Sequence, residues 1–168
     1  VLSKDLKVFL RQFEDDNSFD HITLETRGRL KLIGKSINSG ICRLYLDRCG
    51  AAAYILSPKG ASKLLDQYMN ETALADAAIA LARNFKSYQA YPAMAFQLDQ
   101  CSYNEIPFPV ETVSDINPSA QKVKELGLPI TRQRIKRLIH QFRIFGRNLI
   151  GLIKARRTLV PIDRDSFT

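Results

Sequence analysis

Two carboxylates stand where a side chain could act as a general base. Asp76 lies within a run of alanines, and Glu25 stands near the end of an alternating polar and apolar run. Either carboxylate could accept the proton of an attacking hydroxyl group. The ordinary alternatives are a helix-surface aspartate at position 76 and a salt-bridging acid at a sheet edge at position 25.

Four further residues are candidates for substrate contacts. Tyr54 could stack on the ring of a bound ligand, although a tyrosine in an alternating strand more often packs in a core. Ser57 is typical of a helix N-cap, and the free amides of a helix N-terminus can bind an anion. We expect the strand before it to deliver Tyr54 and Ser57 to the carboxyl-terminal edge of a sheet. Gln97 and Asp99 close an apolar run and would line a cleft at its end.

An acidic run at residues 14–16 could bind a divalent cation. Its oxygen ligands, from Glu14, Asp15 and Asp16, suit Mg²⁺ or Mn²⁺. The run follows an amphipathic helix pattern, so a solvated helix end is the alternative. The three cysteines form no C-x-x-C pair and there are only two histidines, His21 and His140, which excludes the usual zinc spacings. We expect reduced thiols and surface histidines.

The residues between these groups predict alternating strands and helices. The predicted helices cover residues 3–13, 57–68 and 72–85. The predicted strands cover residues 21–26, 30–33, 42–47, 51–56 and 87–97. Prolines interrupt the pattern repeatedly between Leu98 and Pro129. This order predicts an α/β or α+β architecture with a mixed sheet.

The composition places the chain among ordinary globular proteins, with 45% hydrophobic and 25% charged residues. No apolar stretch reaches the length of a membrane-spanning helix, roughly 18 residues. The sequence opens without a basic segment followed by an apolar run, so a secretory signal is absent or precedes Val1. We therefore expect a cytoplasmic protein.

The net charge of +8 belongs to one segment. Nine of the 25 basic residues lie between Thr131 and Arg157, where there is no acid, and the other 16 nearly balance the 17 acids. Apolar residues recur there at helical spacing: Ile135, Leu138, Ile139, Phe142, Phe145, Leu149, Leu152 and Ile153. A basic amphipathic helix is typical of an anionic membrane surface. The alternatives are packing on the domain core and nucleic-acid binding, for which no motif is present.

Residues 50–65 carry a glycine, a short Ala/Tyr/Ile strand that ends in Ser, and a helix with Ala and a Leu pair. This run resembles the characteristic segment of glycosyltransferase family 25. Three other pieces occur in the order of that family, and the resemblance covers roughly residues 1–100. They are Phe-Asp-His-Ile-Thr-Leu-Glu-Thr at 19–26, Ala75-Asp76, and Tyr-Pro-Ala-Met-Ala-Phe-Gln at 91–97.

The resemblance implies a GT-A-like fold, a UDP-sugar donor (often UDP-galactose), inverting transfer and a divalent metal, usually manganese. It implies acceptors among the sugars of lipopolysaccharide or lipooligosaccharide. Family members hold the metal with a Glu-Asp-Asp cluster at a strand end, and a helix separates that cluster from the Leu-Glu-Thr-like strand. This register places the metal cluster upstream of Val1 and makes Glu14–Asp16 a decoy.

Three regions follow from this interpretation. Residues 1–105 are expected to be the C-terminal, acceptor-side part of a GT-A-like domain, 106–130 an irregular connection, and 131–168 a basic amphipathic helical tail. The whole would transfer a hexose to a cell-surface glycan, peripherally at the inner membrane face if the tail binds lipid. This chain alone is expected to be inactive. The alternative is a non-catalytic remnant, or a basic module that binds membrane or nucleic acid.

Overall fold

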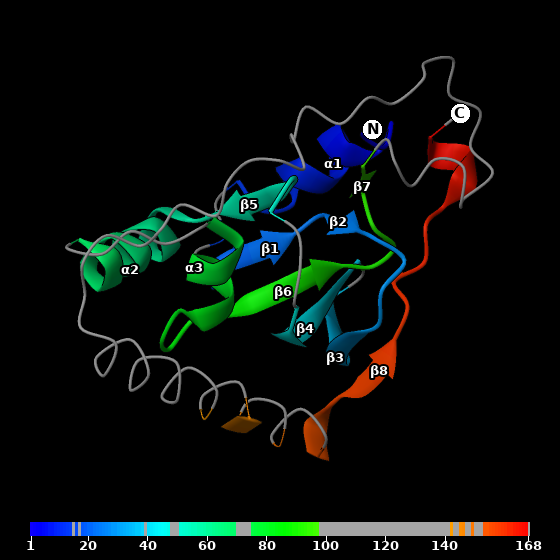
Figure 1. The fold of residues 1–168 in the computed structure, drawn as a ribbon. Coiled ribbons are helices and arrows are strands. Elements are labelled where there is room, and N and C mark those ends of the chain that lie inside the picture. The colour runs from blue at the N-terminus through cyan, green and yellow to red at the C-terminus, as the bar shows by residue number, and fades with distance from the viewer. Residues whose placement is uncertain are drawn as a thin grey trace, which may run out of the picture.

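The computed structural model describes most of the first 97 residues and the end of the chain. The described residues are 1–14, 16, 18–38, 40–47, 51–69, 75–97, 142, 145, 146, 149 and 153–167, without the side chains of Asn38, Asp76 and Leu81. Within them the fold is mixed α/β, with a mixed six-stranded sheet and few helices, which confirms the predicted class (Figure 1).

The elements follow one another along the chain in the predicted order, with different bounds. The helices are α1 (Leu6–Arg11), α2 (Pro58–Tyr68), α3 (Ala75–Leu81) and the 3-10 helix η3 (Arg164–Ser166). The strands are β1 (His21–Thr23), β2 (Glu25–Thr26), β3 (Lys31–Asn38), β4 (Ile41–Leu46), β5 (Tyr54–Leu56), β6 (Ser87–Ala90), β7 (Ala95–Phe96) and β8 (Arg156–Thr158). The strand predicted for 21–26 is thus two strands, β1 and β2, and the run at 87–97 is two strands, β6 and β7.

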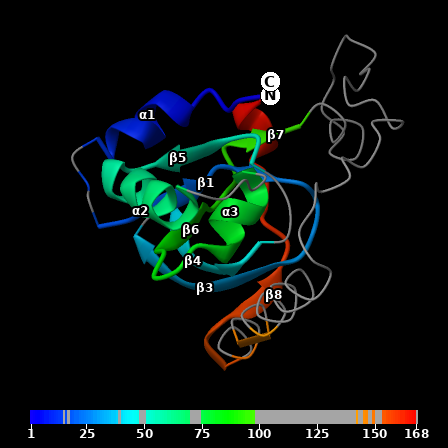
Figure 2. The same cartoon turned by 60° about the vertical axis from the view of Figure 1, so that its left-hand side comes forward.

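The main sheet has the strand order β5-β1-β6-β4-β3-β8, and β2 and β7 form a second pair. β1 and β6 are parallel, and so are β2 and β7, whereas the other pairs are antiparallel. β2 follows β1 after one residue, and β7 follows β6 after four. The two parallel pairs therefore run in the same direction, one after the other (Figures 1 and 2).

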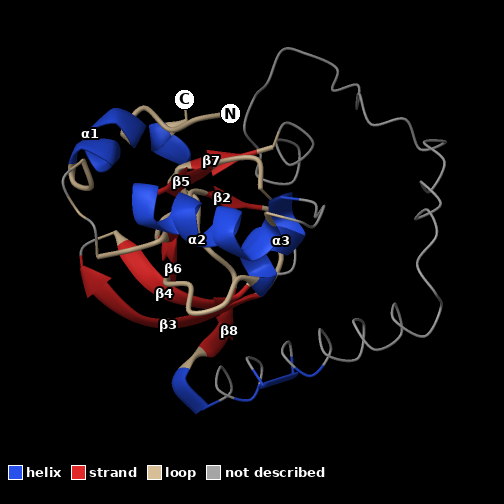
Figure 3. Cartoon of the chain, turned by 90° about the vertical axis from the view of Figure 1, so that its left-hand side faces the viewer, coloured by secondary structure: helices blue, strands red, loops and turns tan. Residues whose placement is uncertain are grey.

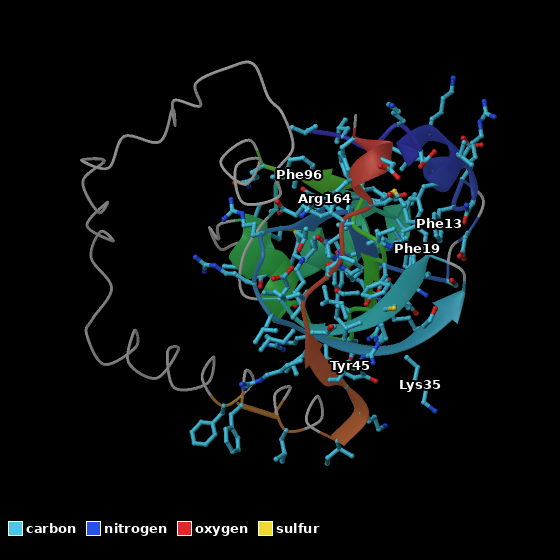
Figure 4. All side chains as sticks on the ribbon, turned by 90° about the vertical axis from the view of Figure 1, so that its right-hand side faces the viewer. Phe13, Phe19, Lys35, Tyr45, Phe96 and Arg164 are labelled. Atoms are coloured by element: carbon cyan, nitrogen blue, oxygen red, sulfur yellow. The ribbon has the colours of Figure 1, made fainter. Side chains whose placement is uncertain are left out.

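The core lies on both faces of β1 because successive strand side chains alternate. Ile22 belongs to an apolar cluster with Phe9 of α1 and with Phe13 and Phe19, whose rings meet edge to face at 5.8 Å (Figure 4). His21 lies on the other face, against the ring of Phe85. α2 and α3 lie together on one side of the strands (Figure 3).

The C-terminal region differs from the predicted helical tail. The prediction is wrong for residues 156–167, since β8 pairs with β3 in antiparallel register. Val160 packs with Ile33 in the core, Ile162 bridges Ala93, and the ring of Phe167 lies 4.7 Å from that of Phe96. The reason is that these apolar side chains are buried only if the chain returns to the sheet, where β3 offers an unpaired edge.

The start of α2 is held against the residues that precede β1. The hydroxyl of Ser57 accepts a hydrogen bond from the Gly60 amide at 3.0 Å, which confirms the predicted N-cap, and donates to the Phe19 carbonyl at 2.9 Å. The Ser57 amide donates to the Asp20 carbonyl at 3.1 Å. A Cβ atom at position 60 would lie only 2.1 Å from that carbonyl oxygen, so this approach requires glycine.

The Asp20 side chain continues the same junction. Its carboxylate is buried and accepts hydrogen bonds from Lys63 Nζ of α2 and from the Lys86 amide before β6, both at 2.7 Å. Burial by itself would raise the pKa of Asp20, but these two hydrogen bonds and the charge of Lys63 outweigh it and lower that pKa. The charged form of Asp20 thus connects α2, β1 and β6.

We expect Gly60→Ala to lower the free energy of unfolding by about 1–3 kcal/mol, because the added methyl group meets backbone rather than a movable side chain. Urea unfolding followed by circular dichroism measures the effect. Gly146→Ala is the matched control, since in the described part of the structure its added Cβ meets no other segment within 4 Å. Helix propensity alone would make alanine the better residue at both positions. A Gly60→Ala protein as stable as wild type would therefore contradict the claim that the contact with the Asp20 carbonyl leaves no room for a side chain.

Candidate functional site

The candidate site lies at the carboxyl ends of the parallel strands. Because β2 and β7 are parallel and in register, the residues that follow them come to the same edge. Glu25, Thr26 and Arg27 reach this edge from one strand, and Gln97 reaches it from the other. Open α/β sheets bind their ligands at the carboxyl ends of strands, so this edge is the first place to look for a site.

Three polar side chains meet there. The Glu25 carboxylate accepts the Ala52 amide at 2.9 Å through one oxygen, and its other oxygen lies 3.4 Å from the Gln97 amide nitrogen and 4.0 Å from Arg27 Nε. The Arg27 guanidinium also donates to the Gln97 side-chain oxygen. We call Glu25, Arg27 and Gln97 the edge cluster. Glu25 and Gln97, predicted from separate parts of the sequence, are therefore in contact.

The members of the edge cluster differ in exposure. The Glu25 side chain is 1% exposed, whereas that of Arg27 is 34% exposed. Glu25 therefore holds the amide and the guanidinium in place, and Arg27 and Gln97 are the members that reach the surface. This arrangement makes Glu25 a positioning residue in the observed structure.

Two polar atoms at this edge have no hydrogen-bond partner among the described residues. They are Arg27 Nε and Thr26 Oγ1, both buried. An unpaired buried donor or hydroxyl costs about 1–3 kcal/mol, so such atoms usually find a partner in water or in a ligand. Their position beside the edge cluster favours a polar ligand there.

Lys31 of β3 supports the site from inside the protein. Its ammonium group is buried and donates to the Glu25 carbonyl at 2.9 Å, to the Gln89 side-chain oxygen at 2.7 Å and to Asp47 at 2.6 Å. All three ammonium hydrogens are thus used. The Gln89 amide donates to the same Glu25 carbonyl at 3.3 Å. The backbone of Glu25 is therefore held by side chains from two other strands, β3 and β6.

His21 is buried, which corrects the surface position expected for it. Its ring lies 5.6 Å from that of Tyr54 and 6.1 Å from that of Phe85, centroid to centroid. Burial, and then the charge of Lys31, lower the pKa of His21 to about 4. Its Nδ1 atom is buried and has no hydrogen-bond partner among the described residues. The neutral imidazole is the form that this site holds. His140 lies outside the described residues.

The expected placement of Ser57 beside the other candidates is wrong. β5 is antiparallel to β1, with Leu56 opposite His21, so the end of β5 lies at the amino end of β1. Ser57 is buried there and its hydroxyl caps α2. Tyr54 lies opposite Thr23, half-exposed, with its ring against His21. β5 therefore carries Tyr54 toward the edge cluster and Ser57 away from it.

The remaining predicted residues are only partly described. Asp76 lies in α3, but its side chain is outside the described part of the chain, as are Asp15 and Asp99 altogether. Glu14 is exposed, and Asp16 accepts the Ser18 amide at 2.7 Å. Hydrogen bonding to the Ser18 side chain, and then to its amide, lowers the pKa of Asp16. Within the described residues no group of three or more His, Cys, Asp or Glu side chains could hold a metal ion.

The sequence contained weak signals for two residues that its analysis missed. Arg27 directly follows the predicted strand 21–26, which is where a ligand-binding residue often lies. Lys31 interrupts an apolar run between Leu30 and Leu32, where a solvent-facing lysine would be the ordinary interpretation. Only the contact of β3 with Glu25 and Gln89 shows that Lys31 is buried.

Comparisons with protein-family models, with curated proteins and with solved structures find no match to this chain. A functional proposal therefore depends on the geometry described above and on the motifs of the sequence. Over the part of the chain that the structure describes, no helix is long and apolar enough to cross a bilayer.

The pKa of His21 makes stability depend on pH. Its folded value of about 4 lies below the ordinary 6.5, so the unfolded chain takes up the proton first as the pH falls. The contribution of the neutral ring is complete above pH 6.5 and should be lost toward pH 4, by roughly 3 kcal/mol.

Urea unfolding at several pH values between these limits measures the loss. We expect His21→Phe to flatten the dependence in this window and His140→Gln to leave it as in wild type. An unchanged dependence in His21→Phe would show that the titration belongs to other groups.

Proposed function

We propose that this chain is the acceptor-side part of a sugar-nucleotide-dependent hexosyltransferase with a GT-A-like fold. The observation that carries the proposal is the edge cluster, in which a buried carboxylate orients an amide and a guanidinium at the carboxyl ends of parallel strands. The family 25 motifs support it independently, since two of them supply Glu25 and Gln97. In this proposal Arg27 and Gln97 contact the acceptor sugar.

The chemistry of the edge cluster suits a sugar. Each hydroxyl of a hexose can donate and accept a hydrogen bond, and neighbouring hydroxyls present such groups in pairs. Gln97 offers an oxygen and an NH₂ group, and Arg27 offers donors in a rigid fork. Because Glu25 already orients both, little side-chain entropy would be lost when a ligand binds. Thr26 Oγ1 and Arg27 Nε are two further groups that a ligand could satisfy.

Inverting transfer also needs a base for the acceptor hydroxyl. Glu25 is the less suitable of the two predicted carboxylates, since its oxygens already accept protein hydrogen bonds and its side chain is 1% exposed. Asp76 is therefore the proposed base. Tyr54, beside His21 on the neighbouring strand, is proposed to pack against a face of a bound sugar.

The donor would be bound mainly by residues outside this chain. A divalent metal held by an acidic cluster would neutralise the charge that builds on the UDP leaving group. Val1 pairs with Phe96 of β7, donating to its carbonyl at 2.8 Å and accepting its amide at 3.1 Å, and Leu2 bridges Ala95. In this antiparallel register a residue that precedes Val1 would lie opposite Gln97. An acidic cluster placed there would meet the edge cluster.

Saturation-transfer NMR tests the proposal with methyl β-galactoside, methyl β-glucoside and UDP-galactose with Mg²⁺ as probes. We expect transfer to at least one methyl hexoside and little to UDP-galactose. Arg27→Ala and Gln97→Ala should each weaken hexoside binding about tenfold or more, because a fixed hydrogen-bonding group is lost. Arg11→Ala and Gln12→Ala on the exposed end of α1 are the matched controls.

Each other outcome of this experiment has a definite meaning. If a folded chain binds none of the three probes, the non-catalytic alternative is favoured over the transferase. Binding of UDP-galactose that is lost with EDTA would place a donor site in this chain. Glu14–Asp16 would then be the candidate metal ligands, to be tested by mutation. If the control variants lose hexoside binding to the same extent, the loss is not specific to the edge cluster.

A further inference from the structure

Four large apolar side chains near the end of the chain face solvent. Phe142, Phe145, Leu149 and Ile153 are helical and are 72%, 64%, 52% and 79% exposed. Their spacing of three, four and four residues places them on one face of a helix. We call these four residues the apolar stripe. Packing on the domain core, one of the alternatives for this segment, is therefore wrong for the stripe.

Positive charge accompanies the apolar stripe. Lys154, Arg156 and Arg157 follow it directly and are exposed. The sequence from Thr131 to Arg157 contains nine basic residues and no acid. Apolar side chains can insert into the apolar interior of a layered surface, and basic residues close to them in the chain can then meet anionic groups in its outer layer. A bilayer with anionic lipids has this layering.

The stripe is also attached to the folded domain. Two residues separate Ile153 from β8, which pairs with β3. The Lys154 carbonyl oxygen lies 3.6 Å from the position of an added Cβ on Gly34, so the backbone of Lys154 lies against β3. Binding through the stripe would therefore hold the edge of the sheet at a fixed place relative to the bound surface.

We propose that the apolar stripe, with Lys154, Arg156 and Arg157, is a docking surface for an anionic phospholipid bilayer. The four apolar side chains insert at the level of the acyl boundary, and the cationic groups contact lipid phosphates. The helix lies in the interface and does not cross the bilayer. This inference does not depend on the proposed function, so either can fail while the other stands.

A single tryptophan can test the insertion, because the chain contains none. We expect Phe145→Trp to show a blue-shifted emission, with shielding from acrylamide, when vesicles of phosphatidylcholine and phosphatidylglycerol are added. Vesicles of phosphatidylcholine alone should produce no shift. Val8→Trp is the matched control, since Val8 is exposed on α1, and its emission should not change with either vesicle.

Co-sedimentation with the same vesicles separates the apolar and the electrostatic contributions. The double variant Phe142→Ser with Ile153→Ser should lose binding, and Lys154→Gln with Arg157→Gln should weaken it about thirtyfold. Leu65→Ser and Lys59→Gln on α2 should bind as wild type does, since both remove exposed side chains from another part of the surface. Circular dichroism checks that each variant is folded.

Three results would overturn the proposal. The first is no sedimentation with anionic vesicles at low salt, and the second is unchanged binding by the serine variant. The third is capture of the stripe by another partner, seen as binding of duplex DNA or RNA in place of vesicles, or as a dimer that the serine variant dissociates.

Discussion

The structure depends on one tight junction around Asp20. The backbone carbonyl of Asp20 receives the Ser57 amide, and Gly60 approaches it so closely that no side chain fits between them. The Asp20 carboxylate then receives Lys63 and the Lys86 amide. One buried residue thus sets the positions of α2, β1 and β6 relative to each other. Burying a charged carboxylate removes it from water, which is unfavourable, but here hydrogen-bond donors on two sides stabilise its charge.

The edge cluster depends on that junction through the strands that it aligns. β1 and β6 begin side by side directly after Asp20 and Lys86, and β2 and β7, which follow them, end side by side at Thr26 and Phe96. At the amino end of the pair α2 packs close by, and the Asp20 and Ser57 side chains are hydrogen-bonded within the fold. At the carboxyl end, by contrast, Arg27 Nε and Thr26 Oγ1 have no hydrogen-bond partner among the described residues.

Much of the fold could be predicted from local patterns. The extended backbone of His21 to Thr26, the Ser57 N-cap and the mixed order of strands and helices all reflect interactions within a few residues, and the structure confirms them. The alternation of residues 21–26 does not mark a half-buried strand, because all six residues are buried. The C-terminal strand could not be predicted in this way. Arg156–Thr158 is basic and short, and it is a strand only because β3, more than a hundred residues earlier, offers it an edge. The burial of His21 has the same origin, since Phe85 and Tyr54 come from other elements.

For the candidate site, the sequence by itself determined which residues carry groups that could bind a ligand or accept a proton. It also determined that Glu25 and Gln97 stand at strand ends. The charge and the apolar periodicity of residues 131–157 follow from the sequence as well. Only the tertiary structure decided that Glu25 and Gln97 meet, that Arg27 joins them and that Lys31 is buried beneath them. The direction of β5 separated Ser57 from this group. The physical reason is that strand direction and pairing depend on contacts between distant segments, whereas propensity and periodicity act only along the chain.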